Sequence, residues 1–196
     1  KGTISGPLND ELAGRFSAYR TRSDGDIKNE YDGHDLNGGS RDGFRGQLLF
    51  KPNESFNLRW IGDYNEEDSS AGTRVLYNTG PTINGVNLYQ NRANAAGATL
   101  VDGTHRKVNL NNDQHVTVHQ GGTSVEANWT LPSDFTLTSI SAYRWWNFTP
   151  RNDDGLNVTA FYNAGVSVED KQYSQEFRLA SPTGRFFDYV LGAYYF

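Results

Sequence analysis

Alternation of apolar and polar residues, interrupted by short turns, constrains the fold of this chain more than any other feature. The stretch EFRLASPTGRFFDYVLGAYYF (176–196) contains two such runs, one on each side of SPTG. Side chains along a strand alternate between two faces, so each run predicts a strand with one apolar and one polar face. Pro182 and Gly184 have the backbone preferences of a tight reversal between two strands.

The same pattern recurs along the chain. It predicts further strands at residues 1–5, 12–21, 44–50, 56–64, 124–130 and 135–146. The facing of 135–146 is undecided, because Ile140 and Ala142 are out of phase with Leu137 and Tyr143. The short links GPLND, KPNES and LPSD alternate with long polar connections at about 22–41, 65–121 and 147–168. Short turns on one side of an antiparallel, up-and-down sheet and long loops on the other are typical of outer-membrane barrels.

The composition agrees with such a barrel. Mean hydropathy is −0.70 and only 36% of residues are hydrophobic, yet aromatic residues reach 13%, which argues against disorder. No apolar run approaches the roughly 18 residues of a membrane helix. A barrel keeps its hydrophobic surroundings on the outside, so its chain can be polar on average.

Several function classes are disfavoured. The net charge is −5 and no basic stripe with interleaved aromatics is present, so we expect no nucleic-acid partner. The chain has no Cys, which excludes a thiol nucleophile and a cysteine metal site. No Ser-His-Asp order, paired-carboxylate spacing or phosphate-binding glycine loop is evident, so we expect neither an enzyme nor a cofactor.

Several segments together resemble the barrel of TonB-dependent outer-membrane receptors. They are SGPLNDELAGRFSAYRTRSDG (5–25), FRGQLLFKPNESFNLRWIGDYNEEDS (44–69), LTSISAYRWW (137–146) and SQEFRLASPTGRFFDYVLGAYYF (174–196). The resemblance implies an all-β chain whose strands form part of a transmembrane barrel of about 22 strands. It also implies active uptake of a ferric siderophore, cobalamin, haem or carbohydrate in a Gram-negative bacterium. The implied partners are TonB, through an N-terminal region, and the lipid and lipopolysaccharide of the outer membrane.

The chain matches only part of that architecture. We expect residues 1–196 to supply seven to eight strands of the barrel wall, without the plug domain, the TonB box or the remaining strands. The start at Lys1 and the absence of Met also favour a segment of a longer protein. The loops named above are expected to contribute to ligand capture.

Candidate ligand-contact residues of these external loops are His105, His115, His119, Trp145 and Trp146. His115 and His119 are separated by a strand-like VTV, and four strand residues span about 13 Å, too far for two ligands of one metal. Polar loop histidines are the simpler interpretation. The two tryptophans offer stacking surfaces, although barrels also concentrate aromatics at the membrane interfaces.

Charged residues within the predicted strands indicate a polar face. Arg59, Glu126, Arg144 and Arg178 lie opposite the apolar rows of their strands, so a barrel would turn them into its lumen, toward a plug or a polar interior. Solvated cross-strand charge pairing explains them equally well.

Two rival architectures remain open at this stage. A soluble or surface-exposed carbohydrate-binding β-sandwich would pack its apolar rows between two sheets. A small, self-contained eight-stranded outer-membrane barrel would close on itself as a pore or adhesin.

Overall fold

The computed structural model describes residues 1–70, 72–101, 103–153, 156–158, 162–163, 165–184 and 186–196. Eight strands follow one antiparallel path in chain order, with β10 (Tyr162–Asn163) attached to β9. Consecutive strands of this sheet are neighbours, which is the up-and-down order expected from the sequence. The path runs through β1 (Gly2–Pro7), β2 (Leu12–Ser23), β5 (Gly39–Asn53), β6 (Phe56–Ser69), β8 (His115–Thr130), β9 (Thr136–Asp153), β11 (Val168–Ala180) and β12 (Val190–Tyr195).

The predicted strands all exist, but most are longer than the sequence indicated. The loops assigned to about 22–41, 65–121 and 147–168 were too long, because β5, β6, β8, β9 and β11 extend into them. In His115–Gly122 and Asn147–Asp153 the apolar side chains, such as Val118 and Phe148, fall on the charged face, in the opposite phase to the rest of each strand, yet both segments pair with their neighbours as regular strand. These extensions lie beyond the apolar part of the sheet, where no apolar row is required.

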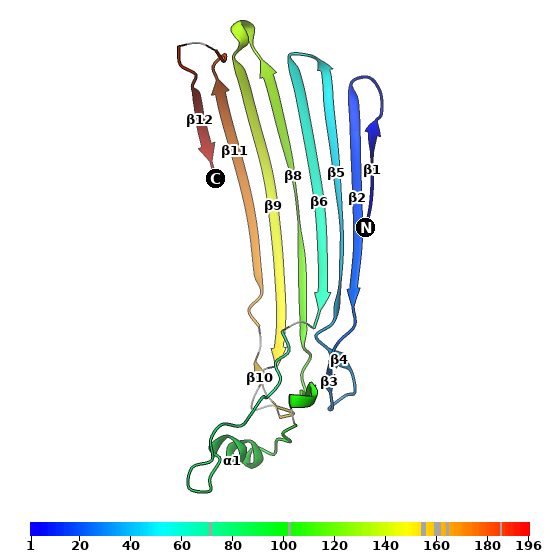
Figure 1. Ribbon diagram of the computed structural model, residues 1–196, viewed down its shortest axis with the longest axis vertical. Helices are drawn as coiled ribbons and strands as arrows, with labels where there is room; N and C mark the ends of the chain where they lie inside the picture. Colours follow the sequence, from blue (N-terminus) through cyan, green and yellow to red (C-terminus); the bar gives the residue numbers. More distant parts are fainter. Residues whose placement is uncertain (71, 102, 154–155, 159–161, 164, 185) are drawn as a thin grey trace.

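Connections at the two ends of the sheet differ in length, as Figure 1 shows. At one end the links are short: residues 8–11 and 54–55, and the turn containing the 3₁₀ segment Pro132–Asp134. The β11–β12 link at that end covers 181–189 rather than SPTG alone, since β12 begins only at Val190. Gly184 adopts the positive φ that was expected of it, 82°.

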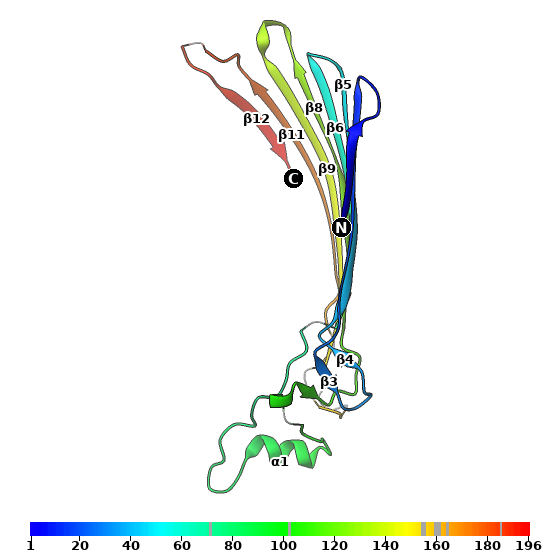
Figure 2. The ribbon, with the colours of Figure 1, turned by 45° about the vertical axis from the view of Figure 1, so that its right-hand side comes forward.

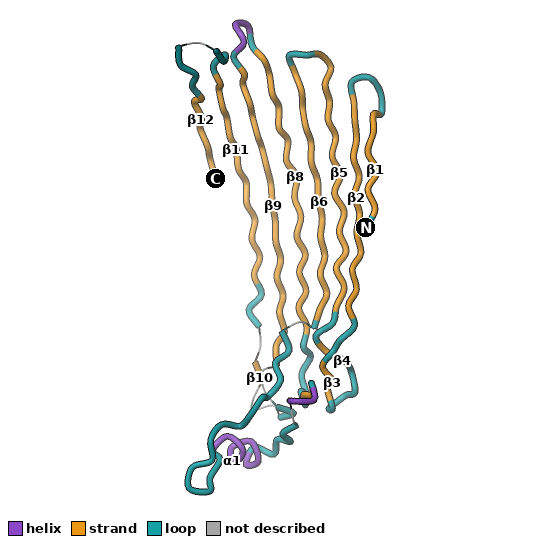
Figure 3. Tube along the Cα trace, in the orientation of Figure 1, coloured by secondary structure: helices purple, strands orange, loops and turns teal. Residues whose placement is uncertain are grey.

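The long connections gather at the opposite end (Figures 1 and 3). They carry β3 (Ile27–Asn29), β4 (Asp35–Leu36), β7 (Lys107–Val108), the 3₁₀ segment Gly103–His105 and the helix α1 (Leu88–Ala95). The side chain of Asn87 caps α1 by accepting a hydrogen bond from the Gln90 N–H at 2.9 Å. The sequence had not predicted this helix. In the part of the chain that the structure describes, no helix is both long and apolar enough to cross a membrane.

The strand registers define two faces. Leu48, Trp60 and Val125 occupy adjacent strands at one level of the apolar face, whereas Arg59 and Glu126 are opposite each other on the charged face. For β9, the register places Leu137 and Tyr143 on the apolar face, opposite Trp129 and Thr123. Ile140 and Ala142 therefore belong to the charged face, which settles the facing of this strand.

The sheet is a single curved layer (Figure 2). Phe16, Trp129 and Phe177 of the apolar face are 50–51% exposed, and no second sheet of the described residues covers them. β1 and β12 lie at opposite edges of the path and do not pair. Neither a β-sandwich nor a closed eight-stranded barrel fits this arrangement.

Candidate functional site at the long-loop end

The apolar face ends abruptly toward the long loops. One row across the strands is mostly apolar; we call it the boundary row, and it consists of Ala18, Phe44, Tyr64, Gly121 and Trp145. The next row on the same face is entirely polar. This polar row consists of Arg20, Asp42, Glu66, His119 and Asn147. The change from apolar to polar therefore occurs within two residues on every one of these strands.

Aromatic rings gather at both margins of the apolar face. In the boundary row, the Tyr64 ring lies 5.5 Å from Phe44 and 6.0 Å from Trp145, measured between centroids. At the short-turn end, Tyr189 lies 6.4 Å from Phe135 and 6.2 Å from Phe187. Aromatic clusters at both margins of an apolar band resemble the girdles of membrane barrels, although rings such as Trp60 and Phe177 also lie within the band.

The polar side chain of Gln175, in the middle of the apolar face, is satisfied locally. The Gln175 amide donates to Ser139 Oγ and to the Glu176 carbonyl, both at 3.1 Å, and its oxygen accepts from Ser141 Oγ. Both ends of the amide thus have partners within the sheet. Such closure is required of a polar side chain that lies against hydrocarbon.

Ion pairs cross the charged face. Arg59, Glu126, Arg144 and Arg178 share this face, as the sequence predicted. Arg59 pairs with Glu126, its direct neighbour, and Arg178 pairs with Glu176 on its own strand. Arg144 instead extends across β8 and donates to both carboxylate oxygens of Asp63, at 2.8 and 2.9 Å.

Gly122 makes that long reach possible. It lies between Asp63 and Arg144 in the register, and a Cβ there would be 2.7 Å from Arg144 Cδ and 2.3 Å from the Tyr143 carbonyl oxygen. We expect Gly122→Ala to destabilise the protein by about 1–3 kcal/mol through overpacking. Gly6→Ala is the matched control, because a Cβ at Gly6 has no atom within 4 Å. Denaturant unfolding of both variants measures the difference, and equal stabilities would contradict this role for Gly122.

A polar and aromatic row crosses the charged face near the long loops. This mouth row consists of Tyr19, Gly43, Asn65, Gln120 and Trp146. The Tyr19 ring lies over Gly43, and its hydroxyl accepts a hydrogen bond from the Asn65 amide. Gln120 in turn donates to Asn65 Oδ1 at 3.3 Å. Trp146 stacks on Phe148 with centroids 5.4 Å apart and planes 11° apart.

The five sequence-predicted contact residues do not come together. His115, His119, Trp145 and Trp146 lie on strands β8 and β9 rather than in loops. His115 pairs with Asp68 at 3.3 Å and His119 contacts the Tyr64 hydroxyl at 2.9 Å, both on the same face as Trp145. His105 lies in the 3₁₀ segment of the long connection. Only Trp146 reaches the mouth row.

Tyr19, Asn65 and Gln120 of the mouth row were missed by the sequence reasoning. The phase of Tyr19 relative to Phe16 and Ala18 places it on the polar face, but nothing in the sequence marks it as a contact residue. Asn65 and Gln120 lie in strand extensions that had been assigned to a loop. Their proximity depends on the register of two long hairpins, which no local pattern reveals.

The long connections fold together into one body, which we call the loop assembly. A parallel pair joins β3 to β7, and Ile27, Leu36, Val108 and Leu110 pack around it. A second small core joins Ala93 and Ala98 of one connection to Leu156 of another. Described residues of all three long connections thus contribute to shared cores, although the connections are far apart in sequence.

Buried polar bonds hold the loop assembly in register. Asn29 is 2% exposed and binds the backbone of Leu110 twice: its amide donates to the carbonyl at 3.0 Å and its oxygen accepts from the N–H at 2.9 Å. Asp153, also buried, accepts from the backbone and side chain of Asn112, each at 3.1 Å. Lys107–Glu30 and Arg106–Asp26 are ion pairs at its surface.

Charge and hydrogen bonds link Asp32 to His34 in one turn of the loop assembly. Burial raises the pKa of the Asp32 carboxyl, but hydrogen bonds from the backbone and ring of His34 and the charge of that ring lower it more. The pKa of Asp32 therefore lies below its usual value, and this carboxyl stays ionised to lower pH.

No group of His, Asp or Glu able to hold a metal ion occurs among the described residues.

Comparison with known proteins identifies the architecture. No family model matches the sequence, and no curated protein sequence matches it significantly. Among solved structures, the ferric yersiniabactin uptake receptor FyuA from Yersinia pestis matches with a TM-score of 0.69 and 19% identity over 98% of this chain. The fold is that of a barrel segment of a TonB-dependent receptor. The chain covers 27% of the length of that receptor chain, so it corresponds to a part of the barrel wall.

Proposed function

We propose that this chain forms part of the wall of an outer-membrane TonB-dependent receptor in a Gram-negative bacterium. The receptor would take up a scarce ligand, with a ferric siderophore as the first candidate and cobalamin, haem or carbohydrate as the others. No bond is made or broken in such transport. The observation that carries the proposal is the abrupt change from the boundary row to the polar row, which is the expected edge of a hydrocarbon layer.

The height of the apolar face supports this placement. Trp129 and Gly121 mark its two margins on β8 and are eight residues apart. Eight residues at about 3.4 Å each give about 27 Å along the strand. A strand tilt of about 40° reduces this to a height of about 21 Å, near the band of about 25 Å in outer-membrane barrels.

The two ends of the sheet then have different roles. Short turns face the periplasm in outer-membrane barrels and long loops face outward. The loop assembly would therefore meet the ligand first, and the charged face with its mouth row would line the interior. Lipid and lipopolysaccharide would contact the apolar face, and TonB would act through a part of the receptor other than this wall.

Transport by the intact protein tests the proposal. We expect cells that carry the complete gene to accumulate a radiolabelled ferric siderophore, and otherwise identical cells without TonB to accumulate none. The panel should contain catecholate, hydroxamate and carboxylate siderophores, together with cobalamin and haem. Accumulation that does not depend on TonB, or recovery of the protein in the soluble fraction, would refute the proposal.

Adjacent tryptophans provide a test of which face meets the ligand. Trp146 lies in the mouth row and Trp145 in the boundary row of the opposite face. We expect Trp146→Ala to raise the Kd for the transported ligand about twofold to about tenfold, since an aromatic contact is worth about 0.5–1.5 kcal/mol. Trp145→Ala should leave the Kd unchanged. Equilibrium binding to the purified receptor measures both, and the reverse order would mean that the two faces are misassigned.

A further inference from the structure

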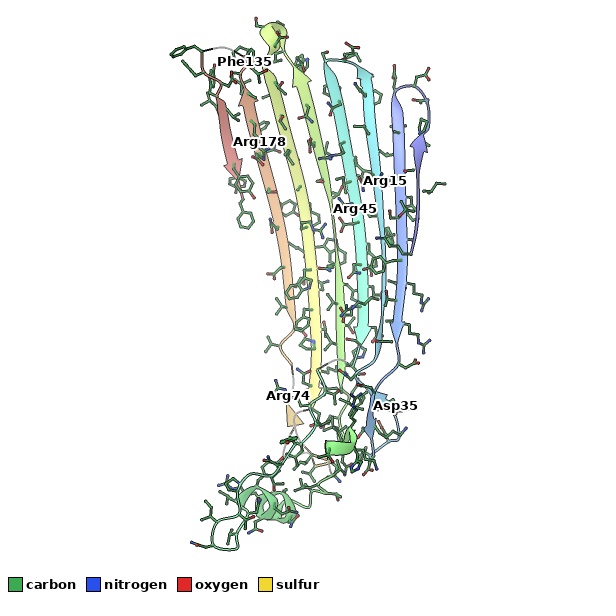
Figure 4. All side chains as sticks on the ribbon, in the orientation of Figure 1. Arg15, Asp35, Arg45, Arg74, Phe135 and Arg178 are labelled. Atoms are coloured by element: carbon green, nitrogen blue, oxygen red, sulfur yellow. The ribbon has the colours of Figure 1, made fainter. Side chains whose placement is uncertain are left out.

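The charged face becomes partly apolar beyond the mouth row, toward the long loops. Between the mouth row and the short turns this face carries arginines, among them Arg45 and Arg178 (Figure 4). The first row beyond the mouth row instead places three apolar side chains on the neighbouring strands β8, β9 and β11: Val118, Phe148 and Val168. The opposite face is polar at this height, so these side chains lie outside the level of the apolar band.

Trp146 extends this apolar group into the mouth row. Its ring stacks on Phe148, while Val118 and Val168 are directly opposite Phe148 on the two neighbouring strands. We call these four residues the inner patch. Val168 is 37% exposed, and the other three side chains are half-buried. Apolar side chains that gather on a wall with polar surroundings mark a binding site.

An unpaired carboxylate borders the inner patch. Asp170 is exposed, shares the charged face and is directly opposite Trp146 on β11. Among the described residues it has no ion-pair or hydrogen-bond partner, since the adjacent Lys171 pairs with Glu169 on the other face. A carboxylate can only accept hydrogen bonds. A ligand group that binds beside Asp170 must therefore donate hydrogen bonds or carry a positive charge.

We propose that the inner patch binds an aromatic ring of the transported ligand and that Asp170 accepts a hydrogen bond from a donor on that ring or beside it. Phenols and aromatic amines have this chemistry. Contact between aromatic rings is worth more than burial of the same area, so Phe148 and Trp146 favour a flat ring over an aliphatic chain. The unpaired carboxylate disfavours a ring with a negative charge. The proposal rests on the proposed function and narrows its ligands to those that present such a ring.

Binding of a phenol to the purified intact receptor tests the ring site. The probe is radiolabelled tyramine, a phenol with a cationic tail, and equilibrium dialysis measures its Kd. We expect Phe148→Ala to raise this Kd about fivefold and Phe148→Tyr, which keeps the ring, to restore it. Phe44→Ala removes a ring from the boundary row of the opposite face and should leave the Kd unchanged.

A second variant tests the carboxylate and keeps every ring in place. Asp170→Asn preserves the size of the side chain but removes its charge. We expect it to raise the Kd for tyramine about twofold to about fivefold, and to lower the Kd for para-hydroxyphenylacetate, whose tail is anionic, by a similar factor. Asp42→Asn is the control, because Asp42 lies in the polar row of the opposite face.

Three results would overturn the inner patch as a ring site. They are no binding of tyramine by the unsubstituted receptor, equal binding in Phe148→Ala, and equal competition by cyclohexylethylamine, which has the same charge but no aromatic ring. An unchanged preference between the two phenols in Asp170→Asn would overturn the role of the carboxylate. Failure of the proposed function itself has a different signature, since ligand accumulation by cells would then not depend on TonB, whatever the receptor binds in dialysis.

Discussion

Val125→Arg in the intact protein should lower the free energy of unfolding in a lipid bilayer by about 2–4 kcal/mol. Val125 is in the middle of the apolar face, at the level of Leu48 and Trp60 on neighbouring strands. A guanidinium group there would lie at the midplane of the membrane, where outer-membrane barrels show a penalty of this size. Denaturant titration of the receptor folded in vesicles measures the change.

Ser124→Arg is the control for that experiment. Ser124 is the preceding residue on β8 and belongs to the charged face, where its cross-strand neighbours are Ile61 and Ala142. A guanidinium group there enters a polar interior, so we expect a change within about 0.5 kcal/mol, as at surface positions. Equal losses in the two variants would remove the case for lipid contact on one face alone.

Asn29→Ala should open the loop assembly without affecting the sheet. The substitution removes both hydrogen bonds to Leu110, together with the longer one from the Tyr31 N–H at 3.4 Å. It leaves the N–H and carbonyl of Leu110 buried without partners. We expect a local loss of about 2–6 kcal/mol, because each of the two unsatisfied buried groups costs about 1–3 kcal/mol. Hydrogen exchange at the Leu110 amide should accelerate by about 30-fold to about 25,000-fold.

The matched change is Asn91→Ala on the exposed surface of α1, where the asparagine side chain has no hydrogen bond to a described residue. Exchange at Leu110 should then stay as in the unsubstituted protein. We also expect ligand affinity to fall only in Asn29→Ala, since the assembly must be closed to present a fixed surface. Unchanged exchange at Leu110 after Asn29→Ala would show that the two backbone groups have other partners.

The barrel-wall fold was largely predictable from the sequence, because the alternation that marks a strand is imposed by the same two faces that define the sheet. The facing follows directly from the phase of the apolar residues. Leu48 and Phe50 are out of phase with Gln47, and Val125 and Trp129 are out of phase with Glu126. β9 was ambiguous because Ile140 and Ala142 place aliphatic side chains on the charged face, next to Glu126 and Ser124.

The candidate site was much less predictable. Beyond the polar row the few apolar side chains, such as Val118 and Phe148, lie on the charged face, so the phase of the alternation is reversed while the hydrogen-bonded ladder continues. The first half of His115–Thr130 therefore does not look like a continuation of the same strand. The contacts of the loop assembly join residues such as Asn29 and Leu110 that are far apart in sequence, and no local pattern specifies them. Trp145 and Trp146, similar as sequence features, turn to opposite faces because a strand alternates.

Under the proposed function, the polar strand extensions hold the loop assembly away from the membrane surface. On β9, eight residues separate Trp145 from Asp153, which is about 27 Å along the strand and about 21 Å in height at a tilt of about 40°. Diffusing molecules would reach the loop assembly before they reach the lipid head groups. The length of these extensions is independent of bilayer thickness. Insertions of residue pairs in them should therefore change how far the loops project from the membrane, without changing the position of the apolar face in the bilayer.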